Sequence, residues 1–89
     1  MDIQKALRIK RVVENYFNNN QSIGDKIPAK DLMPNFIKEG IFTSNNKDGL
    51  EIREFLRQLD EANLLKLIPN VFPERKDKNT NWFFTRLKK

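Results

Sequence analysis

Apolar residues recur at helical spacing at the start of the chain and predict an amphipathic helix over about residues 2–17. The apolar stripe of this helix contains Ile3, Ala6, Leu7, Ile9, Val12, Val13, Tyr16 and Phe17. Its other side carries the basic residues Lys5, Arg8 and Arg11. The run Asn18–Asn20 is expected to end the helix, because Asn side chains compete for backbone hydrogen bonds and tolerate left-handed conformations.

A second helical pattern follows a short extended segment. Residues 23–28 are interpreted as a loop or a short strand. Apolar positions then return at helical spacing and predict a helix over about residues 30–40, closed by Gly40. Pro34 would break the interior of a helix but fits its first turn. The sequence therefore predicts a short turn over residues 29–33 and a main helix that begins at about Pro34.

The clearest helical pattern covers about residues 50–63. Its apolar face is formed by Ile52, Phe55, Leu56, Leu59 and Ala62. The remaining positions hold two arginines, Arg53 and Arg57, and four acidic residues, Glu51, Glu54, Asp60 and Glu61. The polar loop over residues 43–49 offers N-caps for this helix, and Asn63 is expected to end it.

The period of the pattern changes after the third helix. Residues 65–87 contain two runs rich in aromatic and β-favouring side chains, which predict an antiparallel hairpin. The polar residues 74–80 between the runs form its basic tip. Pro69 and Pro73 confine the first strand to a sheet edge or a bulge.

Composition narrows the class of protein. A chain of 89 residues is long enough for one domain and too short for two. We therefore expect a single domain over residues 1–89, mainly α-helical with a small antiparallel β-hairpin, of the α+β class. The absence of His and Cys excludes disulfides, Cys/His zinc sites, thiol nucleophiles and His-based triads. No carboxylate arrangement or glycine-rich loop suggests an active site, so we expect no enzyme, no cofactor, no metal site and no evident small-molecule ligand.

The expected location is the cytoplasm. No apolar run approaches the roughly 20 residues of a membrane span, and the N-terminal residues lack the apolar core of a signal peptide. A chain without cysteine is consistent with a reducing compartment.

Positive charge concentrates at the two ends of the chain. The net charge is +5, and residues 74–89 hold six basic residues against two acidic ones. Residues 1–17 hold four basic residues against two acidic ones, whereas residues 50–73 hold three against four. A basic C-terminal region favours polyanions such as nucleic acid.

The predicted order of elements resembles the winged helix-turn-helix superfamily of DNA-binding proteins. In this comparison residues 23–28 match the short first strand, and residues 29–40 match the second helix. Residues 50–63 match the third or recognition helix, and residues 65–87 match the wing. The resemblance rests on element order alone. It implies that the third helix enters the DNA major groove with its N-terminal end first, while the wing touches the adjacent backbone or minor groove.

The resemblance implies a set of contacts to double-stranded DNA. Asn46, Lys47, Arg53 and Arg57 would approach the groove, and the wing contacts would be Arg75, Lys76, Lys78, Asn79 and Asn81. Lys and Arg neutralise phosphates, Arg also bonds guanine edges, and Asn suits adenine. The implied function is that of a transcriptional regulator or an accessory factor of a mobile element.

Two observations keep a different function open. The acidic third helix repels a phosphate-lined groove, which favours a winged-helix module that binds protein, with homodimerisation as a related possibility. Side chains alternate along a strand, so Trp82, Phe83 and Phe84 cannot all face the core. At least one bulky aromatic is therefore exposed or covered by a partner. An exposed ring could also stack on single-stranded bases, although packing against the first helix or a second subunit is the preferred interpretation.

Overall fold

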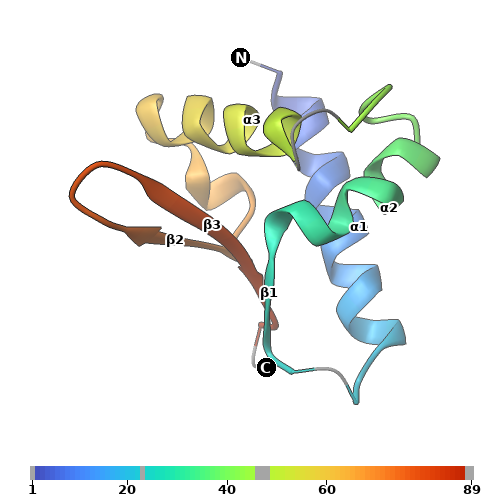
Figure 1. The fold of residues 1–89 in the computed structure, drawn as a ribbon. Coiled ribbons are helices and arrows are strands. Elements are labelled where there is room, and N and C mark those ends of the chain that lie inside the picture. The colour runs from blue at the N-terminus through green and yellow to red at the C-terminus, as the bar shows by residue number, and fades with distance from the viewer. Residues whose placement is uncertain (1, 23, 46–48, 88–89) are drawn as a thin grey trace.

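The computed structural model describes residues 2–22, 24–45 and 49–87, in which three α-helices pack with a three-stranded antiparallel sheet (Figure 1). The predicted α+β class is confirmed. In chain order the elements are α1 (Ile3–Asn19), β1 (Lys26–Pro28), the 3-10 turn η1 (Ala29–Leu32), α2 (Met33–Lys38), α3 (Leu50–Glu61), the 3-10 turn η2 (Leu65–Leu67), β2 (Val71–Arg75) and β3 (Thr80–Thr85).

Helix α1 buries a narrower stripe than the sequence predicts. Its buried residues are Ala6, Ile9, Val13 and Phe17. Ile3 and Leu7 belong to the predicted stripe but are 49% and 47% exposed, because they lie beyond the face that the other elements cover. The carboxylate of Asp2 caps the helix start by accepting a hydrogen bond from the Lys5 backbone N–H at 2.9 Å. The helix ends at Asn19, two residues beyond the predicted end.

The last turn of α1 is held by a side chain from the other end of the chain. Arg86 donates from its guanidinium to the carbonyl oxygens of Phe17 at 2.7 Å and Asn20 at 3.0 Å. It also donates to Asp25 Oδ1 at 3.1 Å. The final carbonyls of a helix have no partner within the helix, so Arg86 supplies charged donors at this end, in addition to the Asn20 backbone N–H that donates to the Phe17 oxygen at 3.4 Å. This basic residue of the C-terminal region therefore has a structural role.

Replacing Arg86 by Ala is expected to destabilise the fold by about 1.5–3 kcal/mol, since hydrogen bonds to charged groups contribute about that much. Urea unfolding followed by circular dichroism measures the change. Arg86→Lys keeps the charge but loses the planar fork, so it should recover only part of the loss. An Arg86→Ala variant as stable as the parent would contradict the capping role.

Helix α2 begins and ends at signals that the sequence offers, and α3 ends at one, whereas α3 begins after Gly49 with no side-chain capping hydrogen bond. As predicted, a short turn precedes Pro34, which lies in the first turn of α2. Gly40 has a φ of +75°, and the Ile41 backbone N–H donates to the Phe36 carbonyl oxygen at 2.9 Å, as in a glycine-terminated helix. Asn63, with a φ of +59°, follows α3 in the same way.

The hairpin starts later than predicted. Leu65–Leu67 forms the turn η2, in which the Ile68 backbone N–H donates to the Leu65 carbonyl oxygen at 2.9 Å, so strand β2 begins only at Val71. The proposed extent of the hairpin from residue 65 is therefore wrong. Pro73 lies on the edge strand β2, as predicted, since the sheet order is β1-β3-β2.

The core lies between the helices and one face of the sheet. Trp82 and Phe84 on β3 are buried on this face, and the ring of Phe84 meets that of Phe36 edge to face at 6.1 Å between centroids. Phe83 points to the opposite face, as side-chain alternation requires. Among the described residues, no helix has the length and apolar character needed to span a bilayer.

Candidate nucleic-acid interface

A groove separates the hairpin from η1 and α3. Its lining residues are Pro28, Lys30, Arg53, Asn79, Thr80, Asn81, Trp82 and Phe83, and we call this space, of about 660 Å³, the hairpin groove. The groove exists because β1 leaves the sheet at Pro28. Strand β1 pairs only with residues 83–85 of β3, so residues 80–82 have no strand neighbour on that side.

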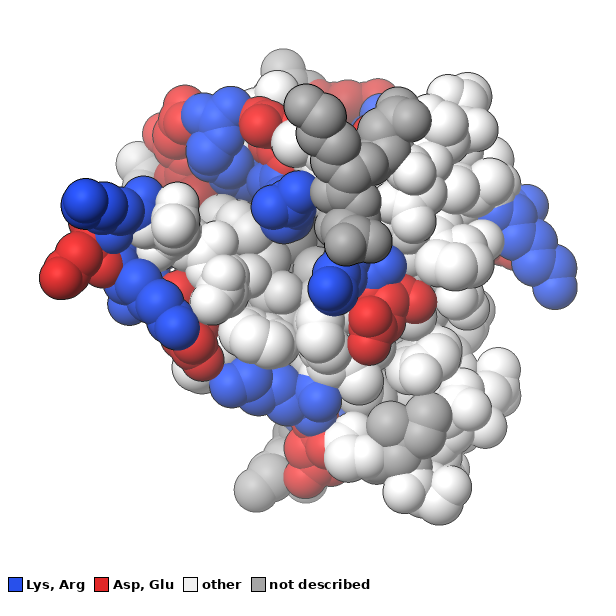
Figure 2. All heavy atoms as spheres, in the orientation of Figure 1, with Lys and Arg blue, Asp and Glu red and all other residues white. Residues whose placement is uncertain are grey.

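A second hollow of about 440 Å³ continues the hairpin groove between α3 and the hairpin tip. The two hollows share Arg53, Asn79, Thr80 and Trp82. The cations that line them are Lys30, Arg53, Arg57, Lys76 and Lys78, and the acids are Glu54, Asp60 and Asp77. Figure 2 shows Lys and Arg side chains, several with Asp or Glu side chains beside them, around a mostly uncharged surface between the hairpin and the helices. Positive charge from η1, α3 and the hairpin therefore gathers around one depression.

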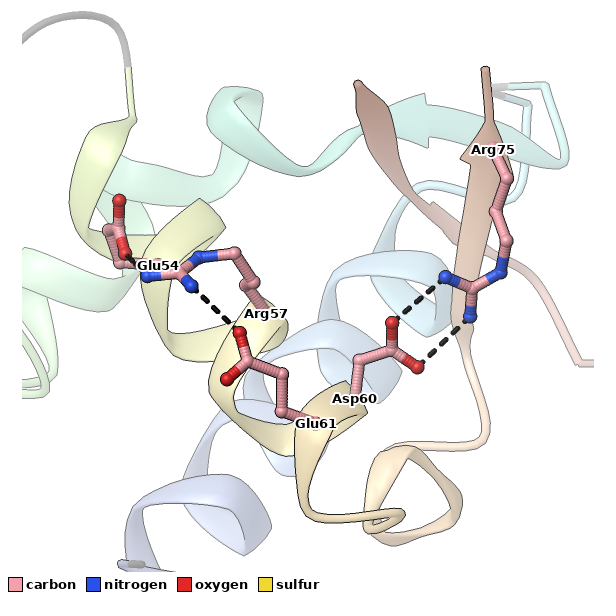
Figure 3. Close-up of polar contacts among 5 residues, drawn as sticks. All are labelled: Glu54, Arg57, Asp60, Glu61 and Arg75. Atoms are coloured by element: carbon pink, nitrogen blue, oxygen red, sulfur yellow. Dashed lines mark hydrogen bonds and ion pairs between the residues drawn. The ribbon is translucent and has the colours of Figure 1, made fainter. Parts of the chain in front are cut away.

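Arg57 is engaged by two acids of its own helix (Figure 3). It forms hydrogen-bonded ion pairs with Glu54 and, at 2.7 Å, with Glu61. The hydrogen bond and negative charge of Glu54, followed by the charge of Glu61, raise the pKa of Arg57 above its ordinary value. This arginine lies at the predicted interface but is held along the surface of α3.

Arg75 ties the hairpin to α3. Its two terminal nitrogens donate to the two carboxylate oxygens of Asp60 at 2.8 and 3.0 Å (Figure 3). A two-pronged contact of this kind fixes geometry as well as charge. The hydrogen bond from Arg75 holds the pKa of Asp60 below its ordinary value, and the same contact raises the pKa of Arg75. Arg75 thus sets the position of strand β2 relative to α3.

The Asp60–Arg75 pair predicts a pH dependence of stability. Because the pKa of Asp60 is lowered in the folded protein, the ion pair stabilises the fold fully at a pH above the pKa of Asp in the unfolded chain, about 3.9. This stabilisation is lost as the pH falls through the lower pKa that Asp60 has in the folded protein. Asp60→Asn should therefore lower the melting temperature at neutral pH, and the difference from the parent protein should shrink as the pH falls through and below the lowered pKa of Asp60. Melting curves across this range provide the measurement, and a pH-independent difference would contradict the assignment.

The remaining predicted contacts at the hairpin tip are directed away from the core. The Lys76 backbone N–H donates to the Asn79 carbonyl oxygen at 2.8 Å, which closes a tight turn with exposed side chains at residues 76–79. The Lys76 ammonium lies 3.6 Å from Glu74, whereas Lys78 forms no ion pair with a described residue. Asn81 lines the hairpin groove together with Asn79.

Lys30 is an interface residue that the sequence did not indicate. It lies in η1 and lines the hairpin groove opposite Asn79 and Asn81, and it forms no ion pair within the described part of the chain. No local pattern marks it, because its place depends on packing of η1 against the start of α3. Arg53 lies beside it in the groove, with its Nε donating to the Gly49 carbonyl oxygen at 3.4 Å. The predicted contacts Asn46 and Lys47 lie outside the described residues.

A third hollow, separate from the two described above, is a groove between α1 and α2. It encloses about 300 Å³, and its charged lining residues are Arg8, Arg11, Lys38 and Glu39. Arg8 already donates to the Glu39 carbonyl oxygen at 2.6 Å. Since α2 and the hairpin lie on different sides of the molecule (Figure 1), this groove is distinct from the hairpin groove and offers a control surface.

Within residues 2–22, 24–45 and 49–87, no group of three or more acidic side chains is placed to hold a metal ion. The hairpin groove instead brings together cationic side chains, side-chain amides and aromatic rings. Such groups can bind the phosphates and base edges of nucleic acid. Neither the models of known protein families, nor curated proteins, nor solved structures match this chain.

Proposed function

We propose that the protein binds double-stranded DNA through the hairpin groove and acts as a transcriptional regulator or an accessory factor of a mobile element. One observation carries this proposal. Lys30 from η1, Arg53 from α3 and Lys78 from the hairpin tip come from distant parts of the sequence and line two hollows that meet at Arg53: Lys30 the hairpin groove, Lys78 the hollow that continues it. Asn79 and Asn81 line the hairpin groove as well.

The arrangement of elements supports the proposal. The described order of helix, strand, two helices and two strands is the order on which the winged-helix resemblance rests. In that arrangement the third helix and the wing contact the same duplex. Here α3 and the hairpin line a common depression, as such docking requires.

The ion pairs of α3 reduce the repulsion that its acidic side chains would exert on DNA phosphates. Three of its four acidic residues are paired with an arginine, since Arg57 contacts Glu54 and Glu61 and Arg75 contacts Asp60. The local charge that a phosphate would meet is therefore less negative than the sequence of α3 alone suggests. The cost is that Arg57 and Arg75 are less available as DNA contacts. The proposed contacts are Lys30, Arg53, Lys76, Lys78, Asn79 and Asn81.

A salt-dependent titration tests the proposal. The four cations of this set predict a slope of log K against log salt of roughly −3 to −4. A labelled duplex of about two helical turns is titrated with protein, and fluorescence anisotropy is measured at several salt concentrations. Binding is expected in the micromolar range or tighter at about 50 mM salt. Absence of binding there would contradict DNA binding.

One observation favours a second candidate function, a protein-interaction module or homodimer. Ile3 and Leu7 are one turn apart on α1, and each is about half exposed. A homodimer through this face would give twice the monomer mass in sedimentation equilibrium, and Leu7→Asp would return it to monomer. A monomer at all concentrations would contradict dimerisation through α1.

A further inference from the structure

The outer face of the sheet carries a row of apolar rings. Phe83 on β3 lies opposite Phe72 on β2 and opposite Pro28 on β1, so the three side chains form one row across the sheet. Trp82 and Phe84 occupy the inner face, which the helices cover. Phe72 is 43% exposed, and Phe83 is half-buried. The fold thus presents two adjacent aromatic rings on a face that it does not use for its own core.

A lysine lies over these rings. The Lys26 ammonium is 4.4 Å from the ring centroid of Phe83 and 4.8 Å from that of Phe72. It also lies 3.6 Å from Glu74. Cation–π and ion-pair contacts at exposed positions are weak, and a base stacked on an aromatic ring gains at least as much. An incoming base can therefore displace the ammonium from the rings.

We propose that Phe72 and Phe83 form a stacking platform for an unpaired nucleobase, with Lys26 contacting the adjacent phosphate. This inference rests on the proposed function and specifies its ligand. The preferred nucleic acid is a duplex that continues into a single strand. The duplex lies in the hairpin groove, and the first unpaired bases stack on the outer face of the sheet.

The stacking platform is continuous with the hairpin groove. Pro28, Asn81 and Phe83 line the hairpin groove, and all three belong to the outward-facing positions of the sheet. A strand that leaves the groove across the uncovered edge of β3 therefore reaches Phe83 and then Phe72 without crossing another element. Stacking suits such a strand because every base has a π-face.

The chemistry around the rings favours nucleic acid over an apolar protein segment. Lys26 places a positive charge directly on the platform, and an apolar segment would have to remove it and its partner Glu74 from water, which costs free energy that an ion pair often does not recover. A nucleotide offers a ring to the aromatic side chains and a phosphate to the ammonium. The Asn81 amide, on the same face, can bond the edge of a base.

Three ligands with the same duplex test the proposal. The first is blunt, the second has a single-stranded tail of about six nucleotides, and the third has a tail of the same length made of abasic residues. The tailed duplex is expected to bind about tenfold more tightly than the blunt duplex, as measured by anisotropy. The abasic tail should give little of this gain, since it keeps the phosphates but removes the bases.

Variants of Phe72 separate stacking from simple apolar packing. Phe72→Leu is expected to remove most of the gain from the tail while leaving blunt-duplex affinity unchanged. Phe72→Tyr should keep the gain. Leu7→Ala, at a similarly exposed apolar position on α1, is the matched control and should keep it too. Thermal melts establish that each variant is folded.

The outcomes distinguish the two proposals. Blunt-duplex binding without a gain from the tail overturns the platform alone. A gain that persists with the abasic tail, or in Phe72→Leu, also overturns it. Failure to bind blunt duplex together with binding of a single strand that depends on Phe72 supports the platform and contradicts the proposed duplex function.

Discussion

Reversing the charges of Lys30 and Lys78 together should weaken duplex binding by about 100-fold or more at about 50 mM salt. The two lysines lie on different rims of the joined hollows between hairpin and helices, and neither forms an ion pair with a described residue. Each Lys→Glu change removes a phosphate contact and adds a repulsive charge. The salt slope should become shallower by about 2. Anisotropy titrations of the double variant across salt concentrations give both values.

The matched control is Arg11→Glu with Lys38→Glu. These residues line the groove between α1 and α2, and the double change alters the net charge by the same amount. Much of its effect is expected to be screened, because the Debye length is about 14 Å at about 50 mM salt. Equal losses in the two double variants would show that binding follows net charge, and a larger loss in the control would place the interface between α1 and α2.

Gly49→Ala should produce the largest loss of stability among single glycine substitutions. Gly49 has a φ of +86° at the start of α3, and an added Cβ would lie 2.6 Å from Cβ and 3.0 Å from Cα of Lys30. Backbone strain of this kind costs of order 1–3 kcal/mol, and the overlap with η1 adds to it. The total is a large share of the roughly 5–15 kcal/mol that stabilises a typical domain. Urea unfolding measures the difference.

Gly24→Ala is the control for this prediction. No atom lies within 4 Å of a Cβ at Gly24, so the substitution should be neutral or stabilise by up to about 1 kcal/mol. Gly40→Ala should fall between the two, because Gly40 has a φ of +75° but its nearest contact, to Arg8, would be an ordinary 3.9 Å. Equal stabilities of the Gly49 and Gly24 variants would contradict the close approach of α3 to η1.

The sequence predicted those features of the fold that depend on neighbouring residues. The spacing of apolar residues located α3, and Pro34 and Gly40 marked the start and end of α2. Local signals failed where packing decided the outcome. Ile3 and Leu7 have the spacing of core residues, yet the covered face of α1 does not reach them.

The candidate site was harder to predict than the fold because its geometry is non-local. Arg57 has acids three residues before and four residues after it, a spacing that itself indicates ion pairs. The partner of Arg75 lies fifteen residues away in α3, and no periodicity connects the two. Lys30 joins the groove only because β1 departs from the sheet at Pro28, which the sequence does not specify.

The fork between Arg75 and Asp60 has a consequence for selectivity. Because it spans β2 and α3, the contact favours one spacing of the hairpin and α3 in the folded chain, so part of the entropy of ordering these two walls is lost before any ligand arrives. If the protein binds DNA as proposed, a favoured spacing gives higher affinity for duplexes whose local shape already matches it and lower affinity for those that must bend or spread. The protein would then select DNA by the shape of its helix as well as by base identity. The Arg75–Asp60 contact would contribute to this selection although neither side chain touches the ligand.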